Sequence, residues 1–177
     1  MAFIGPLSRA TELLNEIIRF SDTVEFRQSW LGNAETPVEL QNLVFAADFH
    51  TEITMNGILG FLENSTGRYL EETVAAIRAM GATHTAATLA QIQQVMRKWN
   101  VSTASLRADL SSGHEYQVAN FENPHPCVSP MLIKEILVTA EALDGGGQVA
   151  PDLGDRFEAY VEEHFDLFSK YMTGAKR

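Results

Sequence analysis

One cysteine, no long apolar run and few positive charges set the first limits on this chain. Cys127 is alone in 177 residues, so no intramolecular disulfide can form. The longest apolar stretches, such as residues 43–47, fall far short of the roughly 20 residues that cross a bilayer. Residues 1–14 contain no apolar run long enough for a signal peptide. We therefore expect a soluble, cytoplasmic protein that has no membrane partner.

Positive charge is scarce throughout the sequence. The chain has 13 lysines and arginines against 23 aspartates and glutamates, which gives a formal net charge of −10. A protein that binds nucleic acid must neutralise phosphates with lysine and arginine, and an acidic protein is repelled by anionic lipid. The composition therefore argues against direct binding of DNA, RNA or an anionic membrane.

The remaining composition is that of an ordinary globular protein. Hydrophobic residues make up 45% of the chain and charged residues 20%. A chain of this length buries about 70% of its unfolded surface and can support its own core. We expect one domain over residues 1–177.

Apolar residues recur at helical spacing along most of the sequence. The first helix follows the i, i+3, i+4, i+7, i+8 rule at Ala10, Leu13, Leu14, Ile17 and Ile18. Start and stop signals and apolar stripes predict further helices at residues 22–32, 37–55, 70–80, 89–99, around Leu106 and Leu110, and at residues 130–143 and 154–172. No internal repeat and no extended strand pattern is present. The fold class predicted is all-α, a compact single-domain bundle of about seven or eight helices.

Two kinds of local signal place the boundaries of these helices. Thr36, Pro37 and Glu39 form a capping box with proline at the first helical position, so a central helix should begin there. Gly57 then interrupts the apolar pattern. Helical periodicity is also lost in an irregular loop at about residues 111–128 and in a glycine-rich hinge at residues 144–153.

A metal site is the first chemistry to consider. His114, His125 and Cys127 lie in or beside the irregular loop, and imidazole with thiolate suits zinc. Their spacing matches no metal-binding signature, so solvent-exposed loop histidines explain them better. We therefore predict no metal and no cofactor, and keep a metal-dependent enzyme as an alternative.

Other catalytic machinery is absent from the sequence. No glycine-rich phosphate loop follows a strand, and no base lies next to Cys127 in any nucleophile motif. His50 and Glu52 are two residues apart on a helix, so their side chains point in different directions. His164 falls in the apolar stripe of the last helix and is expected to be a partly buried core residue. We predict that the protein has no catalytic residues.

Acidic residues are concentrated near the end of the chain. Residues 141–166 hold eight carboxylates and one base, Arg156. Glu158, Glu162 and Asp166 repeat every four residues, which on one helix would form a row at about 6 Å spacing. A solvated helix face explains such a row without any function. The functional interpretation is a surface for a basic partner, with Asp155, Glu158, Glu162 and Asp166 as the binding residues.

A resemblance to a known family adds to this interpretation. Residues 52–67 and 69–82 resemble a widespread bacterial domain family of unknown function that includes a DNA-mimic protein. The matching positions are Gly57, Phe61, Asn64, Ser65, Thr66, Gly67, Gly81 and Ala82. Where the family usually has a glutamine this chain has Gly60, and Ile58 replaces a phenylalanine. The similarity covers about residues 36–96. It implies an all-helical fold, dimerisation, no established enzymatic activity and, for at least one member, an acidic surface that occupies a DNA-binding site.

Three functions follow from these observations. The first is a non-catalytic, DNA-mimic-like module that binds a basic DNA-binding regulator. The second is an immunity or antitoxin protein that blocks a basic nuclease. The third is a metal-dependent enzyme that uses His114, His125 and Cys127. The first two need the same acidic surface, and only the third needs the irregular loop.

Overall fold

Helices make up most of the chain that the structure describes. The structure is a computed structural model that describes residues 7–21, 33, 35–63, 66–102, 129–145 and 147–175. Apart from one two-stranded sheet, the regular elements in those ranges are helical, which confirms the predicted all-α class. None of the helices described is long and apolar enough to cross a membrane.

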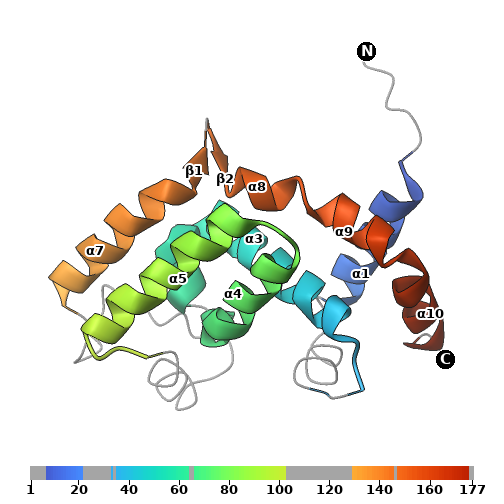
Figure 1. Cartoon of the computed structure of the whole chain (residues 1–177), viewed down its shortest axis with the longest axis horizontal. Coiled ribbons are helices and arrows are strands. Elements are labelled where there is room, and N and C mark those ends of the chain that lie inside the picture. The colour runs from blue at the N-terminus through green and yellow to red at the C-terminus, as the bar shows by residue number, and fades with distance from the viewer. Residues whose placement is uncertain are drawn as a thin grey trace.

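The described elements follow one another along the chain in a simple order. They are α1 (Arg9–Ser21), α3 (Val38–Glu63), η1 (Gly67–Tyr69), α4 (Leu70–Ala79), α5 (Thr83–Lys98), α7 (Pro130–Ala140), η2 (Glu141–Leu143), β1 (Asp144–Gly145), β2 (Gln148–Val149), α8 (Pro151–Gly154), α9 (Phe157–Glu163) and α10 (Phe165–Ala175). Figure 1 shows α3, α4 and α5 in the middle, α7 at one end, and α1, α9 and α10 at the other.

α3 is the central helix, as predicted. It contacts α1, α4, α7 and α8, and its Leu40, Leu43 and Phe49 side chains are fully buried. The Phe49 ring packs edge-on against Phe61, with 5.0 Å between the ring centroids. Gly57 has φ +69° and ψ −177°, so α3 consists of two helical segments joined at a kink. This confirms the predicted interruption, since glycine adopts positive φ at little cost.

The chain turns sharply after α3, and Gly67 makes that turn possible. A Cβ on Gly67 would lie 2.4 Å from the carbonyl oxygen of Phe61 and 2.7 Å from the Cα of Leu62. Backbone atoms cannot move aside as a side-chain tip can, so only glycine fits at this close approach. The glycine of the family motif therefore has a structural role.

Local signals correctly placed two other helix boundaries. α4 ends where Gly81 takes φ +84°, and the Ala82 amide donates to the Ile77 carbonyl at 3.2 Å. α7 begins at Pro130, and the Ser129 hydroxyl accepts a hydrogen bond from the Leu132 amide at 3.2 Å. Both are standard helix ends that satisfy otherwise unpaired backbone groups.

The segment predicted as a glycine-rich hinge, residues 144–153, contains a β-hairpin and α8. β1 and β2 pair in an antiparallel hairpin, with Asp144 opposite Val149 and Gly145 opposite Gln148. The Ala150 amide donates to the Leu143 carbonyl at 2.7 Å, and Leu153 is fully buried. These contacts tie the segment to its neighbours, and its action as a hinge stays a prediction.

The predicted single helix at residues 154–172 is wrong. The chain forms α8, α9 and α10, with breaks at residues 155–156 and at His164, whose φ and ψ are −110° and 19°. α1 packs against both α9 and α10, and Figure 1 shows α10 running steeply away from the direction of α9. A single straight helix could not make both of these contacts with α1, so the chain bends between α9 and α10.

Several predictions lie outside the described residues. They are the helices expected at residues 22–32 and around Leu106 and Leu110, and the irregular loop at about residues 111–128. A single domain over residues 1–177 stays a prediction.

Candidate acidic interface

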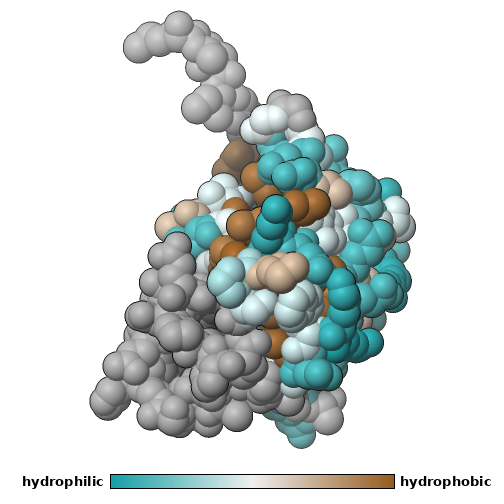
Figure 2. Space-filling view, turned by 90° about the vertical axis from the view of Figure 1, so that its left-hand side faces the viewer, coloured by the Kyte–Doolittle hydropathy of each residue, from teal (hydrophilic) through white to brown (hydrophobic). Residues whose placement is uncertain are grey.

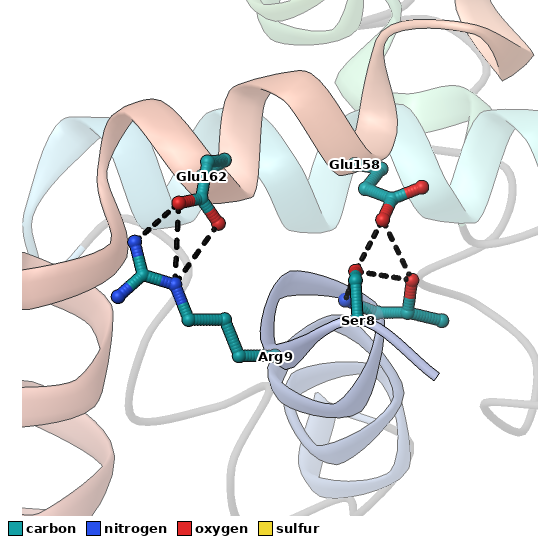
Figure 3. Close-up of polar contacts among 5 residues, drawn as sticks. Ser8, Arg9, Glu158 and Glu162 are labelled. Carbon is teal, nitrogen blue, oxygen red and sulfur yellow. Dashed lines mark hydrogen bonds and ion pairs between the residues drawn. The ribbon is translucent and has the colours of Figure 1, made fainter. Parts of the chain in front are cut away.

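Two of the predicted binding carboxylates, Glu158 and Glu162, lie on α9 above the first turn of α1 (Figure 3). Glu158 accepts hydrogen bonds from the hydroxyls of Ser8 and Thr11, the latter at 3.0 Å (Figure 3). These hydrogen bonds, with that from Ser8 the stronger cause, hold the pKa of the Glu158 carboxyl below its usual value. Glu158 therefore fixes α1 to α9 and is already engaged within the chain.

Glu162 is engaged in the same way, one turn further along α9. Its carboxylate forms an ion pair with the Arg9 guanidinium, whose Nε lies 3.2 Å from Oε1 (Figure 3). The same guanidinium lies over the Phe165 ring, 4.5 Å from its centroid. The Arg9 side chain is 66% exposed and that of Glu162 47%, so water reaches both partners. Such a pair exchanges easily because exposed ion pairs contribute little to stability.

Asp155 and Asp166 occupy different surroundings from this pair. Asp155 lies in the turn before α9, and Asp166 lies in the first turn of α10; both are exposed. The predicted row of Glu158, Glu162 and Asp166 is therefore divided between two helices. Within the described ranges neither aspartate forms an ion pair. The pKa of Arg9 is raised mainly by its hydrogen bond to Glu162 and by the charge of Glu162, and the charge of Asp166 adds to this.

Sequence reasoning counted Glu163 in the acidic segment but not among the binding residues, although it is exposed on α9. Its charge acts on the Tyr160 hydroxyl. Burial is the main cause that raises the pKa of Tyr160, and the nearby charges of Glu39 and Glu163 act in the same direction. Asn42 donates a hydrogen bond to this hydroxyl at 3.4 Å. Glu163 broke the four-residue spacing, so the row pattern could not include it.

Arg156, the one base of the acidic segment, points away from the acidic carboxylates and toward Gly81. Arg156 places its guanidinium carbon 3.5 Å from the position that a Cβ on Gly81 would occupy. The side chain thus covers the corner between α4 and α5, where the helix dipole of α4 favours a cation. Within the described ranges Arg156 consequently forms no ion pair with the carboxylates of α9 and α10.

Asp152 belongs to the acidic segment in sequence but not to the acidic surface. Its carboxylate accepts hydrogen bonds from the amides of His84 and Thr85 at 3.1 and 3.2 Å, and from the Thr85 hydroxyl. These amides lie in the first turn of α5, where no residue within the helix can accept from them. Asp152 therefore caps α5.

The candidate metal ligands His114, His125 and Cys127 lie outside the described residues. Elsewhere, in the ranges that the structure covers, no three His, Cys, Asp or Glu residues are grouped so that they could hold a metal ion. His164 is half-buried, as predicted, with its ring centroid 4.6 Å from Tyr160 and 5.7 Å from Phe168.

A family model for the DMP19-like protein matches residues 34–123, half of the chain. The chain belongs to the DMP19-like protein family. This confirms the resemblance drawn from residues 36–96 and agrees with a DNA-mimic-related domain family. No curated protein and no solved structure matches the chain.

The part that this chain shares with the DMP19-like family is the helical centre of the fold. Residues 34–123 include α3, α4 and α5 with their turn residues Gly67 and Gly81. The carboxylates of α9 and α10 lie beyond the match. Membership in the DMP19-like family therefore identifies the scaffold, and the acidic surface has to be argued from this chain's own residues.

Proposed function

We propose that this protein is a non-catalytic, cytoplasmic interaction module whose acidic face binds a basic DNA-binding protein. The acidic face consists of Asp155, Glu158, Glu162, Glu163 and Asp166. The observation that supports the proposal most directly is that all five carboxylates are exposed and that, among the residues described, only Glu162 is in an ion pair. Exposed carboxylates that lie close together attract arginines and lysines that otherwise bind DNA phosphates.

The members of the acidic face contribute in two ways. Asp155, Glu163 and Asp166 are open to a partner. Glu162 is shared with Arg9 across an exposed ion pair, so an incoming arginine can replace Arg9 at small cost. Glu158 mainly holds α1 against α9, because the hydroxyls of Ser8 and Thr11 donate hydrogen bonds to it.

The test uses a charge reversal that leaves α1 in place. Asp155, Glu163 and Asp166 are changed together to lysine, and Glu158 and Glu162 are kept because their loss would also release α1. The wild type and this triple variant are used as bait in the native cell lysate at low and at high salt, and bound proteins are identified by mass spectrometry. We expect the wild type to retain a basic protein at low salt and lose it at high salt, and the variant to retain none.

The matched control carries the same total charge change on other surfaces. Glu71 and Glu72 on α4 and Asp144 on β1 are exposed carboxylates outside the acidic face, and changing all three to lysine also brings the formal net charge from −10 to −4. The control should keep the partner. Recovery of the same basic protein by a correctly folded Asp155, Glu163 and Asp166 variant would refute the proposed face.

The identity of the captured protein distinguishes the two partner classes. A transcriptional or chromosomal DNA-binding protein would support DNA mimicry in the narrow sense. A basic nuclease whose activity falls as it binds this protein would instead assign an immunity role to the same face.

A further inference from the structure

The Arg9 guanidinium is held on two sides at the acidic face. Its Nε lies 3.2 and 3.4 Å from the two carboxylate oxygens of Glu162, and one terminal nitrogen also donates to Oε1 (Figure 3). Its central carbon, Cζ, lies over the Phe165 ring, 4.5 Å from the centroid. Glu162 lies near the end of α9 and Phe165 opens α10, so the break at His164 sets a carboxylate beside an aromatic ring.

This pair of groups suits arginine better than lysine. An arginine side chain ends in a planar fork, so it can donate to both oxygens of a carboxylate while its flat side rests on a ring. A lysine ammonium is a compact and strongly hydrated charge, which keeps the attraction to a carboxylate but loses the fork and most of the stacking. The chemistry of Glu162 with Phe165 therefore favours a guanidinium, beyond the attraction that any acidic surface has for positive charge.

Arg9 is not the main attachment of α1 to the rest of the fold. The Thr11 hydroxyl donates to Glu158 at 3.0 Å, and Leu13 and Ile17 are buried. The Arg9 side chain is 66% exposed, and an exposed ion pair contributes little to stability. The guanidinium can therefore leave while α1 stays packed, and it leaves behind a site already shaped for another guanidinium.

We propose that Glu162 and the Phe165 ring form an arginine-selective subsite of the acidic face, which Arg9 occupies until an arginine of the partner takes its place. The proposal rests on the proposed function, because the other carboxylates of the acidic face supply the rest of the contact. It specifies that the partner presents an arginine, and not a lysine, at this point. Arg9 then acts as an internal competitor, which lowers the apparent affinity by the fraction of time that it fills the subsite.

The end of the molecule at α7 provides a surface for comparison, since it lies opposite α9 and α10 (Figure 1). Figure 2 looks onto that end and shows brown apolar surface among polar residues. Met131, Leu137 and Val138 of α7 are 65%, 45% and 56% exposed. Apolar side chains offer a cationic peptide no carboxylate to pair with, so we expect such a peptide to bind at the acidic face. Glu141, exposed just after α7 and outside the acidic face, is therefore a suitable control position.

The test compares two fluorescently labelled peptides of equal length and charge, one with arginine and one with lysine at every second position. Fluorescence anisotropy at low salt, where charge attraction is least screened, gives the dissociation constant of each peptide with the full chain. We expect the wild type to bind the arginine peptide at least about three-fold more tightly than the lysine peptide. Phe165→Leu should remove most of this preference, because it removes the ring and keeps an apolar side chain.

Arg9→Lys weakens the internal competitor and leaves the formal net charge at −10. It should tighten binding of the arginine peptide about three-fold or more, since the subsite is then open for more of the time. The lysine peptide should change by less than about two-fold, because lysine gains little from the subsite whether it is open or occupied. Arg78→Lys on α4 is the control: it makes the same exchange at an exposed arginine outside the acidic face and should change neither constant.

Glu162→Gln removes the carboxylate of the subsite and should weaken binding of the arginine peptide about three-fold or more. Glu141→Gln makes the same change of charge away from the acidic face. It should weaken binding of either peptide by less than about two-fold, through the small change in net charge alone.

Equal affinities of the wild type for the two peptides would overturn the subsite. So would an Arg9→Lys variant that binds the arginine peptide no more tightly than Arg78→Lys does. In both cases the acidic face would still stand as a general surface for positive charge. If neither peptide binds at low salt, the acidic face itself is overturned, and the subsite with it.

Discussion

Asp152 accepts hydrogen bonds from both the backbone amide and the side-chain hydroxyl of Thr85, although the two residues belong to different helices. The helix α5 begins after Ala82, which provides no side-chain cap of its own. The carboxylate of Asp152, 67 residues beyond Thr85, supplies that cap and joins α8 to α5. Capping and tertiary packing are thus performed by the same side chain.

Replacing Asp152 with alanine should lower the free energy of unfolding by about 1–2 kcal/mol, the usual cost of losing a helix cap. Urea denaturation measures the change. Asp144→Ala is the control, because Asp144 is an exposed carboxylate of the same acidic segment; it should alter stability by less than about 0.5 kcal/mol. Equal effects of the two variants would mean that the cap contributes nothing.

Gly67→Ala should destabilise the protein by about 2 kcal/mol or more, because the new Cβ would overlap backbone atoms of Phe61 and Leu62. A Cβ added to Gly174 in α10 would meet no neighbouring atom within 4 Å, so Gly174→Ala should be neutral or stabilise by up to about 1 kcal/mol. Thermal unfolding of both variants gives the comparison. A Gly67 variant as stable as wild type would show that the turn after α3 can relax.

Stability should fall as the pH is lowered from about 7.5 to 5.5, partly through His50. Burial lowers the pKa of this imidazole below its usual 6.5, and its ring lies against Phe157 with 5.5 Å between centroids. Below pH 6.5 the unfolded chain gains a proton that the folded chain does not yet bind, so protonation favours unfolding until the folded pKa is passed.

His50→Gln isolates this contribution. We expect the urea midpoint of the variant to depend less on pH than that of the wild type between about pH 7.5 and 5.5. The difference between the two curves cancels the titration of all other groups. Parallel curves would show that His50 titrates alike in the folded and unfolded chain.

Features that depend on neighbours in sequence were predictable. The kink at Gly57, the end of α4 at Gly81 and the start of α7 at Pro130 follow from backbone conformations that particular residues favour or forbid. The break at His164 was not predictable, because it depends on α1 packing against two sides of the chain. Apolar spacing continues through His164 as if the helix were straight.

The sequence showed that carboxylates are concentrated in residues 141–166, but not which of them are available on the surface. Counting carboxylates located the acidic segment, but the count does not reveal that Asp152 and Glu158 are hydrogen-bonded within the fold. The four-residue spacing left Glu163 out of the row, although it is exposed on α9. Which carboxylates remain available depends on contacts between distant residues, such as Thr11 and Glu158, 147 positions apart. Periodicity carries no information about those contacts.

The contact between α1 and α9 also determines the order in which the fold is completed during synthesis. Arg9 and Glu162 are 153 residues apart. At about 5–20 residues per second, a ribosome needs roughly 8–30 s to make Glu162 after Arg9. Throughout that time the apolar side of α1, with Ala10, Leu13 and Ile17, lacks the surface of α9 that finally covers it. The helix α1, made early, is therefore among the last to reach its final packing.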